Sequence, residues 1–357
     1  MRVRLRFGKT LLMNLLTSRL QDRLIDAAEE ADRSPAWPAD SWQILREIDF
    51  LGRSIPVEYG GAGLSPVDQL RGMEELATCC LTTAFVLSQR EAAVRNLLRG
   101  PVPLKEQYLP HLASGESYLT VGLSQLTTSR QHLGPALRAT PDEAGEYRLD
   151  GEIPWVTGAD QATAIVAGAT LPDATQLLVV IPIDRLQGMI EPPLSLAALV
   201  GSRTSLIRCE GVQVGPECVL AGPTENVLGK LGGGGLDTSC LAIGLSAAAT
   251  RFIRREAEAR KELSSIVDRY ETLLQSNRSR LHELAGVTAD PQQTLALRLD
   301  CTKLALRTTQ ACLMIAKGNG FVAPHPAQRW ARQAMFFLVW SCPRPVAEGV
   351  LADLTDW

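Results

Sequence analysis

Hydroxyl side chains and one guanidinium gather in a short stretch of the chain where they could hold a phosphate. Three hydroxyl residues in a row are followed by an arginine, and a further serine stands three residues before them. Hydroxyl and guanidinium groups bind phosphate oxygens through charge-assisted hydrogen bonds. The pattern therefore indicates a ligand-binding loop, with an ordinary Ser/Thr-rich turn as the alternative. The candidate residues are Leu123, Ser124, Thr127, Thr128, Ser129 and Arg130.

Two further short strings could contact a ligand. An aromatic ring and a hydroxyl flank one strand residue in Trp155-Val156-Thr157, and the alternative is an ordinary strand end with a tryptophan in the core. Gly318-Asn319-Gly320 could let the backbone approach a ligand closely. A helix C-cap also favours glycine, so both interpretations stay open.

Nucleophilic and acid–base side chains are few. Cys342 would be a nucleophile if its thiolate were favoured, which nearby Arg344 would help; the alternative is a buried structural thiol. His132 and His325 could transfer protons, or lie at the surface without a chemical role. The eight cysteines form no C-x-x-C pair and the chain has four histidines. A zinc cluster is therefore not expected, and no metal site is predicted.

Composition excludes several classes of protein. The chain has 357 residues, a formal net charge of −3 and a sequence pI of about 5.9, so it lacks the basic character of a nucleic-acid-binding protein. No run approaches the ~20 apolar residues of a membrane span. The basic start of the chain fits an amphipathic helix better than a signal peptide. Free cysteines in apolar surroundings indicate a reducing compartment, and we expect a cytoplasmic protein.

Periodicity divides the chain into three zones. They are predicted as an N-terminal helical domain (1–118), a middle antiparallel β domain (119–225) and a C-terminal helical domain (226–357). Four glycines at 232–235 end the β pattern and could form a flexible hinge. Helices are expected near 11–25 and 40–49, and at 66–78, 81–98, 237–262, 263–286, 290–317 and 326–340. Strands are expected at 147–157, 162–169, 176–182 and 205–214.

This order of helices, strands and helices resembles the acyl-CoA dehydrogenase family, and four local strings agree with it. Residues 56–65 (PVEYGGAGLS) resemble P-x-E-Y-G-G-x-G, and residues 108–116 (YLPHLASGE) resemble Y-L-P-x-L-A-x-G-E. Residues 149–159 (LDGEIPWVTGA) resemble L-x-G-x-K-x-W-I-T-N-A. Residues 317–321 (KGNGF), followed by Arg329 and Arg332, resemble G-G-x-G-F and R-x-x-R-D. The resemblance implies an α+β, mainly α fold with a helical, a β and a four-helix domain.

The resemblance also implies a cofactor and a substrate. FAD would be the cofactor, with Trp155, Val156 and Thr157 supporting the flavin ring and the threonine bonding near N5. The stretch from Leu123 to Arg130 would line the flavin and the CoA end of an acyl thioester. Gly318 to Gly320 would approach the adenosine of a neighbouring subunit's FAD. The partners implied are therefore an acyl-CoA or other acyl thioester and further copies of the chain, as a homodimer or homotetramer.

Serine stands at both positions where family members carry their catalytic glutamate. Counting along the matching strings places Ser341 at one position and Ser239 at the other. A hydroxyl has far too high a pKa to act as a general base by itself. Asp237 lies two residues from Ser239, on a different helix face, and Glu348 could reach the pocket only through a changed loop. The family's R-x-x-F-G loop, which holds the neighbour's FAD pyrophosphate, is not visible after residue 260.

The catalytic residues therefore stay unassigned, and three functions stay open. The first is an FAD-dependent oxidoreductase that acts on an acyl thioester with an altered base. The second is a flavin monooxygenase of the same fold, which takes no α proton and needs no glutamate. The third is an inactive relative that binds an acyl group or a partner, because a fold does not fix a function.

Overall fold

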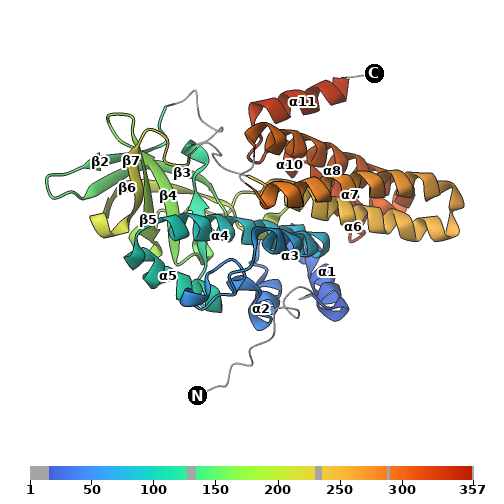
Figure 1. Cartoon of the computed structure of the whole chain (residues 1–357), viewed down its shortest axis with the longest axis horizontal. Helices are drawn as coiled ribbons and strands as arrows, with labels where there is room; N and C mark the ends of the chain where they lie inside the picture. The colour runs from blue at the N-terminus through green and yellow to red at the C-terminus, as the bar shows by residue number, and fades with distance from the viewer. Residues whose placement is uncertain (1–15, 127–133, 230–234, 288–289, 356–357) are drawn as a thin grey trace, which may run out of the picture.

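The computed structural model describes residues 16–126, 134–229, 235–287 and 290–355. Helices, a sheet and helices follow one another along the chain. Figure 1 shows the sheet at one end of the molecule, the long C-terminal helices at the other, and the N-terminal helices below and between them. This confirms the predicted fold class, α+β and mainly helical. The basic start of the chain and Gly232 to Gly234 lie outside the described residues.

Five helices make up the described part of the N-terminal zone. The helix α3 begins where predicted because Ser65 caps it: the serine hydroxyl accepts a hydrogen bond from the Asp68 backbone N–H at 3.2 Å. Pro66 fills the first turn, where its missing N–H has no partner to lose. The helices are α1 (Ser18–Arg33), α2 (Ala39–Glu47), α3 (Pro66–Cys79), α4 (Leu81–Arg99) and α5 (Val102–Ser114).

The sheet is mixed, whereas the sequence predicts an antiparallel one. Strands β1 and β2 both pair in parallel with the same edge of β4, at its two ends. The antiparallel β2–β3 hairpin lies between β1 and β4 in the sequence. The spatial order is β6-β3-β2-β4-β5-β7, with β1 beside β4. The strands are β1 (Leu119–Gly122), β2 (Leu137–Pro141), β3 (Tyr147–Val156), β4 (Ala164–Thr170), β5 (Gln176–Pro182), β6 (Ser205–Val214) and β7 (Val219–Thr224).

Three long helices form the C-terminal bundle, and shorter ones follow. The predicted helix at 326–340 is broken at Met335 and ends at Trp340, after which Ser341 takes a left-handed φ of 43°. Lys317 (φ 54°) interrupts the helical backbone of α8 close to its predicted end. The helices are α6 (Asp237–Ala259), α7 (Ser264–Ala285), α8 (Pro291–Gly320), α9 (Pro326–Ala334), α10 (Phe336–Val339) and α11 (Arg344–Thr355).

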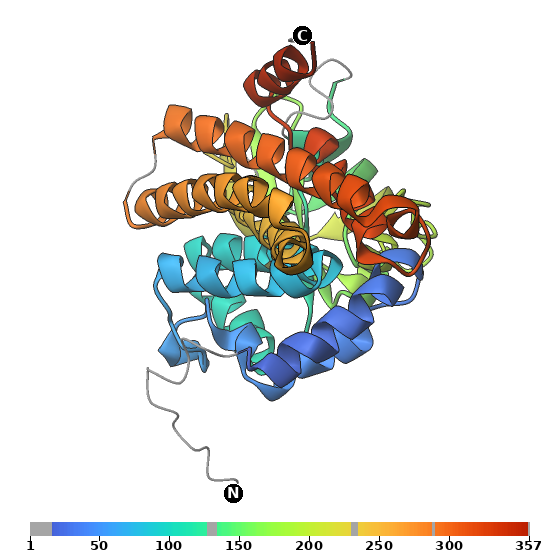
Figure 2. The same ribbon diagram turned by 90° about the vertical axis from the view of Figure 1, so that its right-hand side faces the viewer.

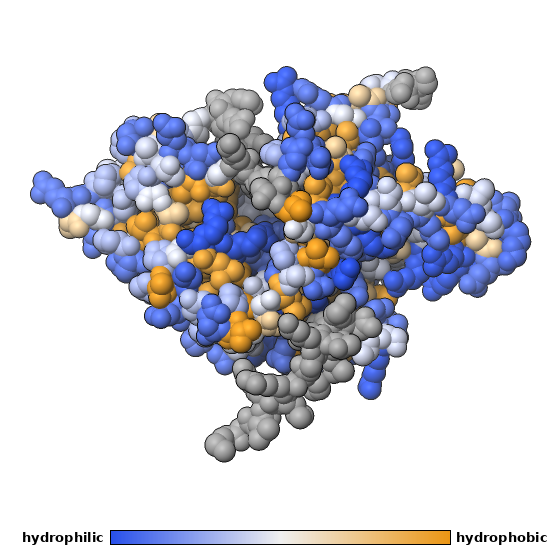
Figure 3. Space-filling view, in the orientation of Figure 1, coloured by the Kyte–Doolittle hydropathy of each residue, from blue (hydrophilic) through white to orange (hydrophobic). Residues whose placement is uncertain are grey.

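Polar and apolar side chains are distributed unevenly over the surface of the molecule. On the face drawn in Figure 3, hydrophilic side chains dominate the free end of the bundle, while apolar side chains gather over the middle of the molecule. Among the described residues, the helices are all too short or too polar to cross a bilayer.

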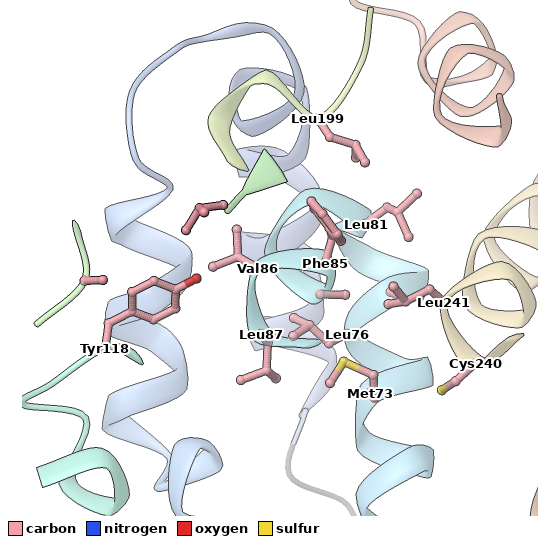
Figure 4. Packing of buried hydrophobic residues seen from close by; sticks show 14 of the residues in the cluster. Met73, Leu76, Leu81, Phe85, Val86, Leu87, Tyr118, Leu199, Cys240 and Leu241 are labelled. Atoms are coloured by element: carbon pink, nitrogen blue, oxygen red, sulfur yellow. The ribbon is translucent and has the colours of Figure 1, made fainter. Parts of the chain in front are cut away.

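The helix α4 lies at the centre of the main core. Its residues Phe85 and Val86 are buried, and Figure 4 shows them between Leu241 of α6 and Tyr118, which directly precedes β1. Burial of each large apolar side chain stabilises the fold by about 1.5–3 kcal/mol. The core is therefore shared by all three zones.

A buried carboxylate joins three parts of the chain. Asp32 of α1 is fully buried. One of its oxygens accepts hydrogen bonds from the Leu199 backbone N–H at 3.0 Å and from the Gln333 side chain at 2.8 Å. Its other oxygen lies 2.7 Å from the Arg332 guanidinium. Figure 2, seen from the free end of the bundle, shows α1 running beside the C-terminal helices.

Substitution Asp32→Ala should destabilise the protein by about 3 kcal/mol or more, because it removes a buried carboxylate that pairs with the partly exposed Arg332 and leaves the Leu199 N–H and the buried Gln333 amide without their acceptor. Urea unfolding followed by circular dichroism measures the loss. The control is Asp26→Ala, on the exposed side of α1, which should change stability by no more than about 0.5 kcal/mol. Equal effects of the two substitutions would contradict a central role for Asp32.

Candidate functional site

A groove of about 500 Å³ opens where the N-terminal helices meet the start of the bundle. Its walls come from α3, α4, the beginning of α6, the end of α7 and the residue after β1. Most of the lining is apolar, as the side chains Leu70, Met73, Leu87, Leu123, Leu236 and Leu284 show. Mostly apolar concave sites with a few polar groups are typical of ligand-binding sites.

Charged side chains line the same groove. Arg95 of α4 forms an ion pair with Asp237 of α6, which links the two helices. Arg99 is exposed one turn further along α4, at the same groove. Glu91 also lines the groove and pairs with the buried Arg90. The groove therefore combines an apolar interior with guanidinium groups that suit an anionic ligand.

Arg53 is held in a position that the fold prepares for it. It is 6% exposed, and its Nη2 donates a hydrogen bond to the Asp68 carbonyl at 2.8 Å. Its guanidinium carbon lies 4.7 Å from the centre of the Phe50 ring. A Cβ at Gly72 would come within 2.0 Å of the Arg53 Nη1, so α3 leaves room for the guanidinium there. Burial lowers the pKa of Arg53, an effect that Glu75 opposes.

The structure brings three of the predicted flavin-binding residues together. The Ser124 hydroxyl donates a hydrogen bond to the Pro154 carbonyl at 3.0 Å, which ties the end of β1 to the end of β3. Beside it, Trp155 has φ 60° and is 44% exposed, so its indole is available to a ligand. Leu123 lines the groove. Thr127, Thr128, Ser129 and Arg130 lie outside the described residues.

The other two residues of the Trp-Val-Thr string face the interior. Val156 and Thr157 are fully buried. The Thr157 hydroxyl is 3.2 Å from that of Thr204, and its carbonyl accepts a hydrogen bond from Tyr118. The left-handed Trp155 falls at a register shift between β3 and β6, which interrupts the alternation of the strand. The indole of Trp155 is therefore exposed here, whereas the hydroxyl of Thr157, which the resemblance places near flavin N5, is buried.

Neither of the two glutamate-equivalent serines lines the groove. Ser239 is fully buried, and its hydroxyl has no hydrogen-bond partner among the described residues. Ser341 is half-buried and follows Trp340, whose ring packs on Phe85 with the centroids 4.7 Å apart. The carboxylate of Asp237 does line the groove, on a different face of α6 from Ser239, as the sequence predicts.

The environment of Cys342 does not favour a thiolate. Burial raises the pKa of this thiol, an effect that Arg298 opposes. Arg344 instead pairs with Glu348 at 2.7 Å on the surface of α11, so neither residue acts on the thiol. The interpretation as a structural thiol fits this geometry better than the nucleophile hypothesis.

Gly318 to Gly320 and His325 lie away from the groove. Gly318 and Asn319 are exposed, and about 36 Å of helix separates them from Thr294, which lines the groove near the start of α8. Contact with a ligand of the same chain's groove is therefore not possible for them. The His325 ring accepts a hydrogen bond from the Ala327 N–H at 3.1 Å and caps α9, which gives it a structural role. His132 lies outside the described residues.

Comparison with known proteins supports the resemblance to acyl-CoA dehydrogenases. The family model "Acyl-CoA dehydrogenase, N-terminal domain" matches residues 11–116. The chain is 23% identical over 331 residues to "Probable acyl-CoA dehydrogenase YngJ" of Bacillus subtilis, covering 86% of this chain and 87% of the relative. Its fold matches butyryl-CoA dehydrogenase from Megasphaera elsdenii with a TM-score of 0.83 at 18% identity, covering 98% of this chain and 100% of that one. The first third of the chain thus matches the acyl-CoA dehydrogenase family model, and the chain as a whole has the acyl-CoA dehydrogenase fold.

Members and neighbours of this family fold carry out different reactions. The fold also matches dibenzothiophene monooxygenase from a Paenibacillus species, with a TM-score of 0.79 at 16% identity and 95% of each chain covered. A structure of that protein contains FMN, and a glutaryl-CoA dehydrogenase from Mycobacterium smegmatis was solved with FADH2. The fold therefore leaves the reaction of this chain open between dehydrogenation and oxygenation.

Sequence patterns did not identify Arg53, Gly72 and Arg95 as parts of the site. Two features could have indicated the first two: Arg53 stands in the largely apolar stretch 50–55, and Gly72 is an isolated glycine inside a helical pattern. Such a glycine lowers the stability of a helix and often has a packing role. Arg95 gave no local signal because its partner Asp237 lies in another helix.

Alkylation should show that Cys342 is a weakly reactive thiol. Iodoacetamide should modify the folded protein at pH 7 more slowly than it modifies free cysteine, and the rate should rise with pH, because the raised pKa leaves little thiolate at neutral pH. Burial raises the pKa of Cys79 and Cys209 to about 12, so Cys342→Ser should remove most of the labelling. Fast labelling that does not vary between pH 5 and pH 8 would show a stable thiolate and contradict this assignment.

Proposed function

We propose that the protein is a flavoprotein oxidoreductase that binds an acyl thioester in the groove, with a catalytic base other than the usual glutamate. One observation carries the proposal: a single groove extends from Leu123, the residue before Ser124, to Asp237 at the start of α6. Ser124 is in turn hydrogen-bonded to Pro154, the residue before Trp155, so the expected flavin-binding segments adjoin the end of the groove at Leu123. The apolar walls suit an acyl chain, and Arg95 and Arg99 suit the anionic CoA end.

The flavin would supply a two-electron acceptor next to the groove. Trp155 offers an exposed ring for stacking, and Ser124 lies beside it. Thr157 does not contribute its hydroxyl in this structure, so the indole and the backbone at Leu123 and Ser124 would carry more of the binding. We propose FAD as the flavin and a homodimer as the assembly, in which Gly318 to Gly320 serve the partner's site, in line with their distance from their own groove.

We propose Asp237 as the base. Both serines at the glutamate positions lie outside the groove, whereas the Asp237 carboxylate lines it and is held by Arg95. A positioned carboxylate removes a proton from carbon only if it is ionised and within reach of it. The ion pair with Arg95 fixes the direction of this carboxylate.

The visible spectrum of the purified protein tests the proposed function. A yellow protein that bleaches when acyl-CoA is added without oxygen would support it. A colourless protein that FAD cannot reconstitute would contradict it and leave the inactive, ligand-binding relative as the better interpretation.

Substitution Asp237→Asn should slow anaerobic bleaching by acyl-CoA by about 100-fold or more, since this is what a positioned base contributes. Stopped-flow absorbance at the flavin band measures the rate. The matched control is Arg95→Gln, which removes the ion pair but keeps the carboxylate and should slow bleaching far less. If Asp237→Asn bleaches as fast as the unmodified protein, Asp237 is not the base.

A flavin monooxygenase is the second candidate. The lack of a carboxylate at Ser239 and Ser341 favours it, because oxygenation requires no α-proton abstraction, and the fold matches a monooxygenase along most of its length. Oxygen consumption after chemical reduction of the bound flavin, measured with and without acyl-CoA, separates the two. Rapid uptake without any bleaching by acyl-CoA would favour the monooxygenase.

A further inference from the structure

The helix α8 is broken close to its end, and a short segment after the break (residues 317–321) reaches the surface. Lys317, at the break, has φ 54° and ψ −149°, a backbone conformation that residues other than glycine rarely adopt. Gly318 and Asn319, which follow it, are exposed. A strained residue of this kind persists only where its surroundings hold it in place. Contacts from outside α8 must therefore maintain the break.

Arg260 supplies such contacts from the end of α6. Its Nη1 and Nη2 donate hydrogen bonds to the Ile315 carbonyl at 3.2 and 3.1 Å, two residues before Lys317. The Nη2 also donates to the Glu256 carboxylate at 2.8 Å, which fixes the guanidinium on its own helix. In an unbroken helix the Ile315 carbonyl would accept from the N–H four residues later, and Lys317 lies between those two groups. Arg260 thus binds a carbonyl of α8 where the regular helix geometry ends.

The segment after the break carries groups that suit a nucleotide. Lys317 is exposed, and its ammonium group suits phosphate oxygens. A Cβ at Gly318 would have no atom within 4 Å, so the backbone there is open to a ligand. Phe321 is 80% exposed and offers a ring on which a purine can stack. A cation, open backbone and an aromatic ring together match the part of FAD that FMN lacks, an adenosine joined through a second phosphate.

We propose that Arg260 is a positioning residue: it holds the break in α8 and thereby places the segment 317–321 at the adenosine end of FAD in the partner's site. The inference rests on the proposed function, in which the flavin is FAD and Gly318 to Gly320 serve the partner subunit. Both Nη atoms of Arg260 already bind acceptors of their own chain, so the residue acts through the segment. The preference for FAD over FMN would then depend on a side chain that does not touch the flavin.

Isothermal titration of the apoprotein with FAD and with FMN tests the proposal. The unmodified protein should bind FAD about tenfold more tightly than FMN or better, since stacking of one base is worth that much. Arg260→Met should lose most of this advantage by weakening FAD alone, while the affinity for FMN, which does not reach the segment, changes less than about twofold. Arg260→Lys can still donate to the Ile315 carbonyl and should keep more of the advantage.

Two further variants separate the segment from the arginine. Gly320→Ala keeps Arg260 but brings a Cβ within 2.6 Å of that of Ala316, so the segment must shift, and the advantage of FAD should be lost here too. Arg254→Met removes an exposed arginine of α6 that pairs with Glu271, and it should keep the advantage in full. Gly320→Ala tests the proposal even if Arg260→Met does not fold.

The outcomes are distinct. If the unmodified apoprotein binds neither flavin, the proposed function fails and the inference fails with it. If it binds FAD no more tightly than FMN, or if the advantage survives in Arg260→Met, the role of Arg260 is wrong while a flavoprotein still stands. Equal weakening of both flavins in Arg260→Met would show a general structural role instead. Loss of the advantage in Arg260→Met but not in Gly320→Ala would show that Arg260 binds FAD directly, which also contradicts the proposal.

Discussion

The carboxylate of Asp32 joins three segments of the fold that are far apart in the sequence. On one side it binds the Leu199 N–H at the turn that leads into β6. On the other it binds Arg332 and Gln333 of α9, the helix that leads into α10 and the turn at Ser341. The approach is close, since a Cβ at Gly201 would come within 2.5 Å of the Ala31 carbonyl of α1. Burial of this carboxylate without these partners would be strongly unfavourable, so the folding of the three segments is coupled.

The same turn explains why Thr157 faces inward. Beyond Leu199 the chain continues to Ser202 and Thr204, whose hydroxyls are 2.9 Å apart, and Thr204 in turn meets the hydroxyl of Thr157. The Gly158 N–H donates to the Ser202 carbonyl, and Tyr118 completes the network. Because buried hydroxyls need partners, a threonine satisfied in this way gains nothing by turning outward. Thr157 thus faces inward, unlike the position that the resemblance implies, because of the surrounding network of hydroxyls and not because of its own side chain alone.

Local signals in the sequence predicted much of the fold. The bounds of α3, β5 and β6 follow from a capping serine before a proline and from short apolar runs between turn residues. The strands β1, β2 and β7 and the helix α11 were missed, because they are short and depend on neighbours from elsewhere in the chain. The helix α5, which contains Pro110, was missed as well. The parallel pairing of β1 with β4 is a matter of topology, which periodicity does not encode.

The candidate site was predictable only in part, for a related reason. The resemblance pointed to Ser124 and Trp155, and the structure places the ends of β1 and β3 side by side. The groove was not predictable, since Arg53, Arg95 and Asp237 come from three distant segments. The inward position of Thr157 depends on Thr204, almost fifty residues away in the chain. The candidate site depends on contacts between residues that are distant in the sequence, and a single sequence does not show such contacts.

Contacts of the residues before Ser341 fix the turn that carries it. Arg298 of α8 is 3% exposed and donates from Nη2 to the carbonyls of Phe337 and Trp340, at 3.2 Å each. The rings of Trp340 and Phe336 pack on Phe85. These contacts use backbone carbonyls and apolar surface, so they hold the residues before Ser341 in place through the fold of the bundle.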